Sequence, residues 1–326
     1  MPLFLNTLKR HGHLDPVQII IACVGSRKLG GQDDLGTGWR LFAPNLTIYG
    51  FDADVDACDA ANANLAQSPW REVHYPLALS DQVGEETLYV TKHPMCSSLF
   101  PPNEALLSQY AALPDLVNLD FTVQLETTTL DQFCQQEGVP RIDFLQMDVQ
   151  GAELKVLEGA VEMLPTVLGL QTEVSFSPLY QRQPLFAEVD SYLRQRQFSF
   201  FNFEFRGSAG VRRRSPIQSN TRGGQLLWAD AIYLRDGALP DLTKLDDPEA
   251  LDRYFRLACI ADVLEFPDYA LDLLVELTLG SDRNYADSIV ASLAQVPNLA
   301  TYGLTDLPVV QQLQPYLSDQ ASEQLG

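Results

Sequence analysis

The sequence predicts an α/β fold: a doubly wound, mostly parallel sheet with an antiparallel last strand, followed by a C-terminal α-helical appendage. Three observations support this prediction. Apolar runs of strand length alternate with helical segments between residues 17 and 196. The last two apolar runs, 198–205 and 225–234, have no helix between them, which favours an antiparallel hairpin at the sheet edge. After Gly237 the sequence becomes acidic and helical.

The predicted elements follow one another in a regular order. The runs "VQIIIACVG" (17–25) and "LTIYGFD" (46–52) indicate buried strands, and the Ala-rich segment 54–67 predicts a helix with Asp54 as its N-cap. The segment "TTTLDQFCQQEG" (127–138) is typical of a Thr-capped helix that ends at a glycine. The other predicted strands are 71–80, 85–90, 120–126, 142–148 and 166–176, and the other predicted helices are 152–164 and 184–196.

Composition divides the chain near residue 237. Residues 1–236 hold the alternating pattern, whereas residues 237–326 carry 15 acidic and 4 basic residues. Asp247 as N-cap and Pro248 at the first helical position predict where the first of three or four short helices begins. We therefore expect an α/β domain and an acidic all-α extension, whose helices offer a surface for a protein partner or for self-association.

Charge and hydropathy exclude several classes of partner. The formal net charge of −21 argues against nucleic acid and anionic membranes, because binding to phosphates needs clustered Lys and Arg. No apolar run reaches the length of a transmembrane helix, and the N-terminal "MPLFLNTLKRHGHLD" lacks the order of a signal peptide. The five cysteines form no CxxC pair, which favours reduced thiols. We expect a cytoplasmic protein without membrane insertion.

Acidic residues stand where two predicted strands end. Asp52 closes the second strand, and Asp148 closes the strand within "IDFLQMDVQGAELKVLEGA" (142–160). The carboxyl ends of strands form the ligand-binding edge of an open α/β sheet, so Asp52 is placed to accept hydrogen bonds from ribose hydroxyls. A solvated turn acid at Asp52 and a simple helix cap at Asp148 are the alternatives. Glu153 falls in the next helix's first turn, where the helix dipole stabilises an acid with or without a catalytic role.

The first loop, "VGSRKLGGQDDLGTG" (24–38), contains five glycines, beginning with Gly25. Glycine lets the backbone approach a ligand closely, and a following helix N-terminus favours anions. The spacing matches neither GxGxxG nor the phosphate-binding GxxxxGK[ST], which argues against a nicotinamide dinucleotide or a triphosphate. A flexible connection is the alternative interpretation.

The stretch 142–160 closely resembles the signature of FkbM-type S-adenosylmethionine-dependent methyltransferases. The resemblance extends over about residues 15–236 and does not include the appendage. It implies a Rossmann-like sheet with an antiparallel last strand, and methyl transfer from S-adenosylmethionine to a hydroxyl of a sugar or small natural product. The supporting stretches are "IYGFDADVDAC", "PLALSDQVGEETLYV", "SSLFPPN", "EVSFSPLYQRQPLF" and "GGQLLWADAIYL".

The resemblance also implies a cofactor site at the ends of the first three strands. Its residues are Gly25 and Ser26 for the methionine part, Asp52 and Ala53 for the ribose, and Ala78, Leu79 and Ser80 for the adenine. One position departs from the family, which usually has an acid in a pattern such as DVGA, whereas this chain has "ACVGS" with Cys23 in that place. A thiol does not accept from an ammonium group as a carboxylate does.

On the acceptor side, the resemblance places Asp148 facing the methyl group and the acceptor, with Tyr180 and Gln181 forming part of the acceptor pocket. Asp148 is the candidate general base, and Glu153 and Tyr180 complete the candidate catalytic set. We assign no metal site. A Mg²⁺ held by Asp148 is the alternative, but only one or two acids lie nearby in the sequence, and Glu173 is not counted as a second ligand.

Two interpretations of function follow. The first is an active O-methyltransferase with a small-molecule or glycan acceptor, favoured by Asp52 and the segment 148–153. The second is a catalytically inactive methyltransferase fold that acts as a binding or scaffold protein, favoured by Cys23 and served by the acidic appendage.

Two further segments bear on the acceptor. The insertion 91–120 is long enough to form a lid, in which Ser97 and Ser98 would line the acceptor side; a plain surface loop is the alternative. The arginines 212–214 belong to the predicted hairpin tip. They are either a solvated turn or a contact for an anionic acceptor such as a phosphorylated or uronic sugar.

Overall fold

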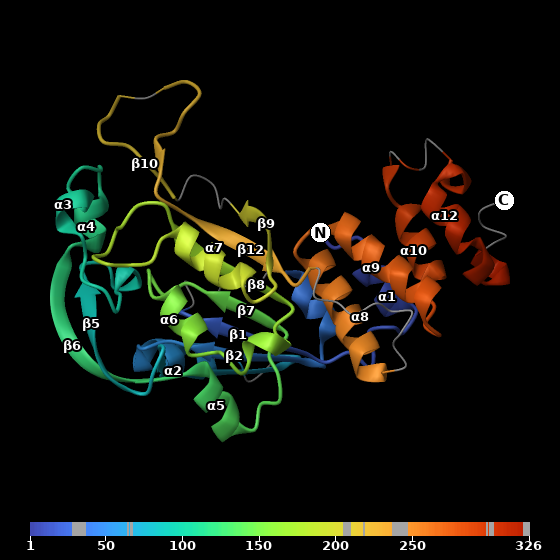
Figure 1. The fold of residues 1–326 in the computed structure, drawn as a ribbon, viewed down its shortest axis with the longest axis horizontal. Coiled ribbons are helices and arrows are strands. Elements are labelled where there is room, and N and C mark those ends of the chain that lie inside the picture. Colours follow the sequence, from blue (N-terminus) through green and yellow to red (C-terminus); the bar gives the residue numbers. More distant parts are fainter. Residues whose placement is uncertain are drawn as a thin grey trace.

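The computed structural model describes residues 1–27, 37–63, 65, 68–204, 210–217, 219–236, 247–297, 299 and 303–321. A seven-stranded sheet lies at its centre, with helices on both faces (Figure 1). In sheet order the strands are β3 (Arg71–Tyr75), β2 (Leu46–Phe51), β1 (Ile19–Val24), β7 (Phe144–Met147), β8 (Gly169–Ser175), β12 (Trp228–Leu234) and β9 (Ser199–Glu204).

The direction of the strands confirms the predicted Rossmann-like, doubly wound sheet. The five strands from β3 to β8 pair in parallel, and β12 runs antiparallel to both of its neighbours, β8 and β9. Every residue of β1 and β2 is buried, as expected for parallel strands covered on both faces. Strands β9 and β12 form the predicted antiparallel pair, with β9 at the sheet edge.

Three predicted elements differ clearly from the structure. The predicted strand 225–234 is divided into β11 (Gln225–Leu226) and β12. The predicted strand 71–80 is divided into β3 and the short β4 (Ala78–Leu79), with Pro76, which has no N–H to donate, between them. The predicted helix 152–164 is shorter in the structure, where α6 spans Glu153–Glu158. Its C-cap is Gly159, where a Cβ atom would lie 2.1 Å from the Ser80 carbonyl oxygen.

Alternate residues of β1 face two separate hydrophobic cores. Ile20, Ala22 and Val24 face α6 together with α5 (Leu130–Glu137) and α7 (Phe186–Arg194). The residues between them face α1 (Leu5–Arg10), the 3₁₀ helix η1 (Thr37–Phe42) and the C-terminal helices. Helix α2 (Val55–Ala63) lies between β2 and β3 in the sequence.

The predicted helix caps are present. Asp54 accepts a hydrogen bond from the backbone N–H of Ala57 at 3.1 Å, and Thr129 accepts one from Gln132 at 3.0 Å. Gly138 ends α5 in a left-handed conformation, and Asp247 caps α8 ahead of Pro248. Such caps satisfy backbone N–H groups that a helix leaves without partners.

Smaller elements lie beyond the carboxyl ends of the parallel strands. They are a three-stranded sheet of β4, β6 (Leu119–Thr128) and β5 (Gly84–Thr91), the short hairpin β10 (Val211–Arg212) and β11 (Gln225–Leu226), and the helices η3 (Pro94–Cys96), α3 (Glu104–Leu107) and α4 (Leu113–Val117). Figure 1 shows these elements at the left, at the opposite end from the C-terminal helices.

The C-terminal segment is helical, as predicted. Its α-helices include α8 (Pro248–Val263), α9 (Pro267–Gly280), α10 (Ala286–Leu293) and α12 (Pro308–Leu313), and its short 3₁₀ helices include η6 (Leu304–Asp306) and η7 (Gln314–Tyr316). None of the helices in the described ranges has the length and hydropathy that a membrane span requires. That these helices bind a partner or a second copy of the chain stays a prediction.

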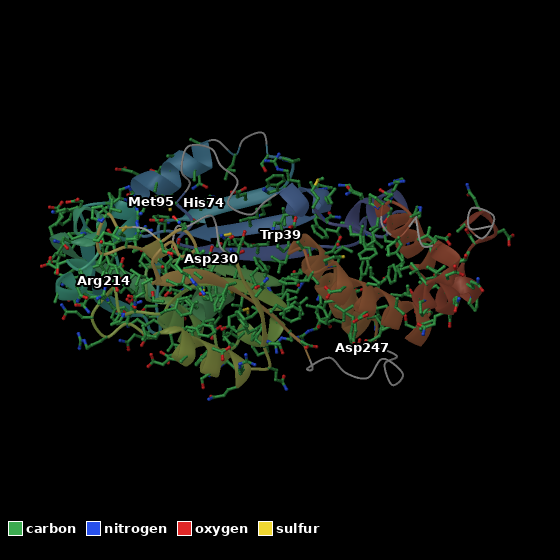
Figure 2. All side chains as sticks on the ribbon, turned by 90° about the horizontal axis from the view of Figure 1, so that it is seen from above. Trp39, His74, Met95, Arg214, Asp230 and Asp247 are labelled. Carbon is green, nitrogen blue, oxygen red and sulfur yellow. The ribbon has the colours of Figure 1, made fainter. Side chains whose placement is uncertain are left out.

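The C-terminal helices share a hydrophobic core with the sheet. The rings of Trp39 and Phe144 lie 4.9 Å apart, in the same cluster as Leu257 and Ile260 of α8. Figure 2 shows Trp39 where the strands meet these helices. The division into domains of 1–236 and 237–326 therefore stays a prediction, and the shared core favours folding as one unit.

Two buried carboxylates connect α8 to the sheet region. Asp143, directly before β7, accepts from the backbone N–H of Ile20 at 2.8 Å and pairs with Arg256 of α8 at 2.9 Å. Asp262 accepts from the backbone N–H groups of residues 3, 4 and 5 at 2.8–2.9 Å. The N-terminal segment is thus held by a carboxylate of the C-terminal helices.

We expect Asp262→Ala to lower the free energy of unfolding by about 3 kcal/mol, because it leaves three N–H groups at the start of α1 without their acceptor. Asp262→Asn keeps one acceptor oxygen and should cost less. Urea unfolding measures both variants, and a loss below about 0.5 kcal/mol for Asp262→Ala would contradict this account of the shared core.

Candidate active site

The carboxyl ends of β2, β1 and β7 are joined by backbone hydrogen bonds. Gly25 and Ser26 both donate to the Phe51 carbonyl at 2.9 Å, and Asp148 donates to the Val24 carbonyl at 2.9 Å. Gly25 has a φ of +81°, and a Cβ atom there would lie 1.9 Å from the Asp148 carbonyl oxygen. Only glycine permits this approach, which places the start of the first loop beside Asp148. The glycines at positions 30, 31 and 36 lie outside the described residues.

Asp52 follows β2 directly, as predicted, and is half-buried. Its Oδ1 accepts from the Asp54 N–H at 2.9 Å, and Asp54 pairs with Arg27 of the first loop. Burial raises the pKa of Asp52, although Arg27 and backbone hydrogen bonds favour its ionised form. Asp52 therefore presents a partly desolvated carboxyl group beside the first loop, while the neighbouring Ala53 is exposed.

Cys23 is the last residue but one of β1. It lies inside β1, paired with Gly50 of β2 and Gln146 of β7, and its side chain belongs to the core on the α1 and η1 side of the sheet. Ser26 is the first polar side chain after β1, and it is buried.

Ser26 begins a buried polar relay that was not predicted from the sequence. Its Oγ lies 2.9 Å from Nδ1 of His74, whose Nε2 lies 3.0 Å from Oε1 of Glu72. The other Glu72 oxygen accepts from the Trp70 indole N–H at 2.9 Å. An ionised Glu72 can only accept a hydrogen bond, so His74 donates to it from Nε2–H. This favours the His74 tautomer in which Nδ1 accepts from the Ser26 hydroxyl. The relay orients the Ser26 oxygen in the loop.

The relay depends on a glycine in the neighbouring strand. A Cβ atom at Gly50 would lie 2.2 Å from His74 Nδ1 and 2.7 Å from Ser26 Oγ. A signal for this arrangement is present in "REVHY" (71–75), where Glu72 and His74 are two residues apart and so share one face of β3.

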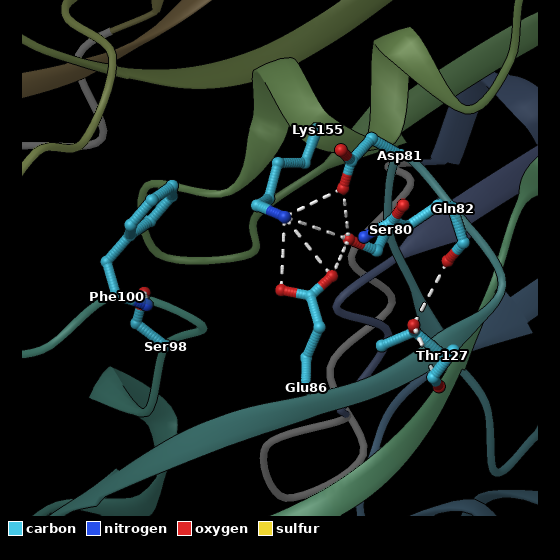
Figure 3. A network of polar contacts seen from close by, with 9 residues as sticks. Ser80, Asp81, Gln82, Glu86, Ser98, Phe100, Thr127 and Lys155 are labelled. Atoms are coloured by element: carbon cyan, nitrogen blue, oxygen red, sulfur yellow. Dashed lines mark hydrogen bonds and ion pairs between the residues drawn. The ribbon is translucent and has the colours of Figure 1, made fainter.

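Residues Ala78–Ser80 lie farther from solvent than the resemblance implies. Ala78 is half-buried, Leu79 belongs to the core under α5 and α6, and Ser80 is fully buried. The Ser80 hydroxyl contacts Asp81 and Glu86, which both pair with Lys155 of α6 (Figure 3). This network already uses the hydroxyl of Ser80, so the predicted adenine contact would have to come from the backbone or from neighbouring apolar groups.

Three carboxyl groups converge at the ends of β7 and β8. One oxygen each from Asp148, Glu153 and Glu173 lie within 4.8 Å of one another. Asp148 is exposed, Glu153 is buried and Glu173 is half-buried. The parallel pairing of β7 with β8 brings Glu173 to Asp148, a contact that was not predicted from the sequence. At this spacing the group could hold a divalent cation or share protons.

The buried carboxyl groups favour their protonated forms. Burial raises the pKa of Glu153 to about 7, with a further contribution from Asp148. Burial also raises the pKa of Glu173 well above its usual range, helped by Asp148, Glu153 and Asp230. Asp148 is therefore the member of the group that solvent best stabilises as an anion.

Glu153 shapes the turn that carries Asp148. Its Oε1 accepts from the backbone N–H groups of Val149 and Gly151 at 3.0 and 3.2 Å. Within this turn Gln150 has a φ of +53°, and its amide Nε2 donates to Asp148 Oδ1 at 2.6 Å. Glu153 is thus a first-turn acid with a definite structural role.

Tyr180 is nearly inaccessible to solvent, and its hydroxyl lies 2.7 Å from the Cys96 carbonyl oxygen and 3.1 Å from Gln150 Oε1. Burial raises the pKa of Tyr180 well above its usual value. The phenol therefore stays protonated and holds Gln150, which in turn contacts Asp148. Gln181 is exposed, and its backbone N–H donates to Pro101 at 2.8 Å.

The insertion forms an ordered cap, which we define as residues 92–118. Ser98 donates to the Gln150 carbonyl at 2.7 Å, which ties the cap to the turn carrying Asp148. Leu107, Tyr110 and Leu113 of the cap pack with Tyr180 and Leu227 in a separate hydrophobic cluster. The cap is thus a packed cover at this end of the sheet.

Comparison with known proteins identifies the family. The methyltransferase FkbM domain matches residues 37–200. The chain belongs to this family. Over 191 residues it is 30% identical to the 2-O-methyltransferase NoeI of Sinorhizobium fredii (strain NBRC 101917 / NGR234), an alignment that covers 54% of this chain and 70% of that protein.

Among solved structures, this FkbM methyltransferase is similar to the magnesium protoporphyrin IX methyltransferase ChlM from Synechocystis PCC 6803 with bound SAM. Identity is 11%, coverage is 71% of this chain and 76% of that one, and the TM-score is 0.30. It is also similar to TrmK of M. capricolum in complex with S-adenosyl-homocysteine, at 8% identity, 91% and 95% coverage and a TM-score of 0.32. At these scores the fold assignment rests on the strand order of this chain alone.

Family membership confirms the expectation of a methyltransferase that uses S-adenosylmethionine. The structure gathers Gly25, Ser26 and Asp52 at one part of the sheet edge, with Asp148 beside them. It places Cys23 in the core and the Ser80 hydroxyl in an ion network. The roles of individual residues in this FkbM methyltransferase are proposals.

The raised pKa of Glu153 gives a signed pH dependence. The folded protein holds this proton more tightly than the unfolded chain, so the stabilisation is present below about pH 4.5 and is lost as the pH rises through about 7. We expect the free energy of unfolding of the wild type to fall by about 1–3 kcal/mol across this window relative to Glu153→Gln. Denaturant titrations from about pH 4.5 to about pH 8 measure the difference. Parallel curves for the two proteins would show that folding does not raise the pKa of Glu153.

Proposed function

We propose that this chain transfers a methyl group from S-adenosylmethionine to a hydroxyl oxygen of a sugar or small natural product. The observation that carries this proposal is the exposed Asp148 carboxylate, which lies at the ligand-binding edge beside two carboxyl groups with raised pKa values. The 2-O-methyltransferase NoeI supports an oxygen acceptor.

The cofactor supplies a methyl group that is already activated by its sulfonium centre. The residues at the edge fit such a ligand. Gly25 and Ser26 begin the loop that would meet the methionine part, and Asp52 offers carboxylate oxygens to the ribose hydroxyls. The side chain of Cys23 belongs to the core on the α1 and η1 side of the sheet. The Ser26 hydroxyl is the polar group that we expect to serve in place of an acid at position 23.

Asp148 acts as the general base. The acceptor hydroxyl gives its proton to the carboxylate as its oxygen bonds to the methyl carbon and the bond from that carbon to sulfur breaks. A positioned base contributes about 10²–10⁴-fold to such a step, and correct placement of the reacting groups contributes more. Glu173 and Glu153, which favour their neutral forms, limit the number of negative charges beside Asp148.

Glu153 and Tyr180 are positioning residues in this proposal. Glu153 fixes the backbone of the turn, and Tyr180 fixes Gln150, whose amide holds Asp148 Oδ1. One oxygen of Asp148 is thereby oriented, which prepares the carboxylate to meet a hydroxyl in a defined direction.

We expect Asp148→Asn to lower kcat by about 10²–10⁴-fold while S-adenosylmethionine still binds, because the amide keeps the shape of the side chain and loses its basicity. Single-turnover methyl transfer to a hydroxylated acceptor measures the chemical step, and calorimetry measures binding.

Asp120→Asn is the matched control, since this exposed carboxylate of β6 belongs to no part of the site and its loss changes net charge equally. If Asp148→Asn abolishes cofactor binding and the residual turnover follows occupancy, Asp148 holds the cofactor and is not the base.

A further inference from the structure

A cationic hairpin emerges from the carboxyl edge of the sheet. We define the arginine hairpin as residues 211–226; it lies between β9, which ends at Glu204, and β12, which begins at Trp228. It contains Arg212, Arg213, Arg214 and Arg222, whereas residue 206, a fifth arginine, lies outside the described residues. Figure 1 shows the hairpin projecting beside α3 and α4 of the cap.

The hairpin is held against the cap. The guanidinium of Arg214 lies 5.2 Å from the ring centre of Tyr110, and its Nη2 is 3.3 Å from both the Tyr110 hydroxyl and Gln225 Oε1. The Ala111 N–H of the cap donates to the Arg213 carbonyl at 2.9 Å. The base of the hairpin is therefore fixed on the acceptor side rather than freely extended.

Arg212 lies near the strand that carries Glu173, because it stacks on Trp228, which pairs with Ser175 of β8. Its guanidinium lies 4.5 Å from the ring centre of Trp228, at the start of β12. Burial raises the pKa of the Cys96 thiol, and the nearby Glu173 and Asp148 raise it further. Arg212 lowers the pKa of the same thiol. The charges of Arg212 and of the acidic group thus both act on Cys96. The Cys96 backbone carbonyl also accepts from the Tyr180 hydroxyl, which contacts Gln150.

In the described part of the chain, no ion pair joins Arg213, Arg214 or Arg222 to a carboxylate. Figure 2 shows Arg214 at the opposite end of the molecule from the acidic C-terminal helices. In a chain of net charge −21, this local cationic surface is an exception that calls for an anionic ligand.

We propose that the arginine hairpin binds an anionic substituent, a carboxylate or a phosphate, on the methyl acceptor. This inference rests on the proposed function. The planar guanidinium fork suits both anions, and stacking on Trp228 orients the fork of Arg212. The exposed Asp148 carboxylate repels the same substituent. The acceptor therefore lies with its anionic end at the hairpin and a distant hydroxyl at Asp148, and the methyl group goes to that distant hydroxyl.

The test uses the full-length protein and acceptors in matched sets of neutral, carboxylate and phosphate forms, such as glucose, glucuronate and glucose 6-phosphate, with the galactose and mannose sets beside them. Methyl transfer gives kcat and KM for each member, and nuclear magnetic resonance of the product gives the methylated position. We expect an anionic member to exceed its neutral counterpart in kcat/KM by about 10- to 100-fold, chiefly through KM. Comparing carboxylate with phosphate distinguishes the two anions.

The variants Arg212→Gln and Arg213→Gln should reduce the anionic-to-neutral ratio of kcat/KM toward one. Arg212→Lys should retain part of the ratio, because it keeps the charge and loses the fork. Arg194→Gln is the control: it removes the same charge from α7, where the side chain pairs with Asp190 away from the site, and should leave the ratio unchanged.

The outcomes separate this inference from the function on which it rests. The hairpin site is overturned if neutral acceptors are turned over as well as or better than anionic ones. It is also overturned if Arg194→Gln changes the anionic-to-neutral ratio of kcat/KM as much as the hairpin variants do. Either result leaves the proposed methyl transfer unaffected. Methylation beside the charged group overturns the proposed orientation. If the cofactor binds but no hydroxylated member is methylated, the proposed function fails and the hairpin inference fails with it.

Discussion

The close approach of Gly25 to Asp148 is the constraint on which the site depends. The Gly25 backbone occupies a position where a Cβ atom would lie 1.9 Å from the Asp148 carbonyl oxygen, and the N–H of Asp148 donates to Val24. Two neighbouring strands therefore end at the same level, and the loop that leaves β1 begins directly beside the backbone of Asp148, the residue that follows β7. A side chain at position 25 would separate these ends, and with them the cofactor side from the acceptor side.

Repulsion between the carboxyl groups organises the acceptor side. One oxygen each from Asp148, Glu153 and Glu173 lie within 4.8 Å of one another. Burial first, and then the neighbouring carboxyl groups, raise the pKa values of Glu153 and Glu173, whereas solvent stabilises an anion best at the exposed Asp148. Hydrogen bonds from the surrounding residues fix the position of Asp148. Glu153 holds the turn, Gln150 holds Asp148, and Tyr180 and Ser98 connect the turn to the cap. The arginine hairpin supplies the opposite charge at the far side of the same region, which gives an asymmetric acceptor a preferred direction.

Local patterns in the sequence were enough to predict the sheet, the caps at Asp54, Thr129 and Asp247, and the positions of Asp52 and Asp148 at strand ends. Contacts between distant segments were not predictable in the same way. Glu173 reaches Asp148 only through the register of β7 with β8, and Ser80 meets Lys155 only because α6 packs over β4. The Ser26–His74–Glu72 relay needs the space left by Gly50 in a neighbouring strand, which becomes apparent only once the strands are paired.

The central claim is that S-adenosylmethionine binds at the ends of β1 and β2 although Cys23 replaces the usual acid. Calorimetric titration of the purified protein with S-adenosylmethionine, repeated with Asp52→Asn, tests this most directly. The account predicts saturable binding by the wild type and an affinity at least about 10-fold lower for the variant, because the amide gives up one of the two acceptor oxygens. An absence of heat at millimolar cofactor, or an affinity unchanged by the substitution, would contradict it. The first of these results would favour a methyltransferase fold retained as a binding protein.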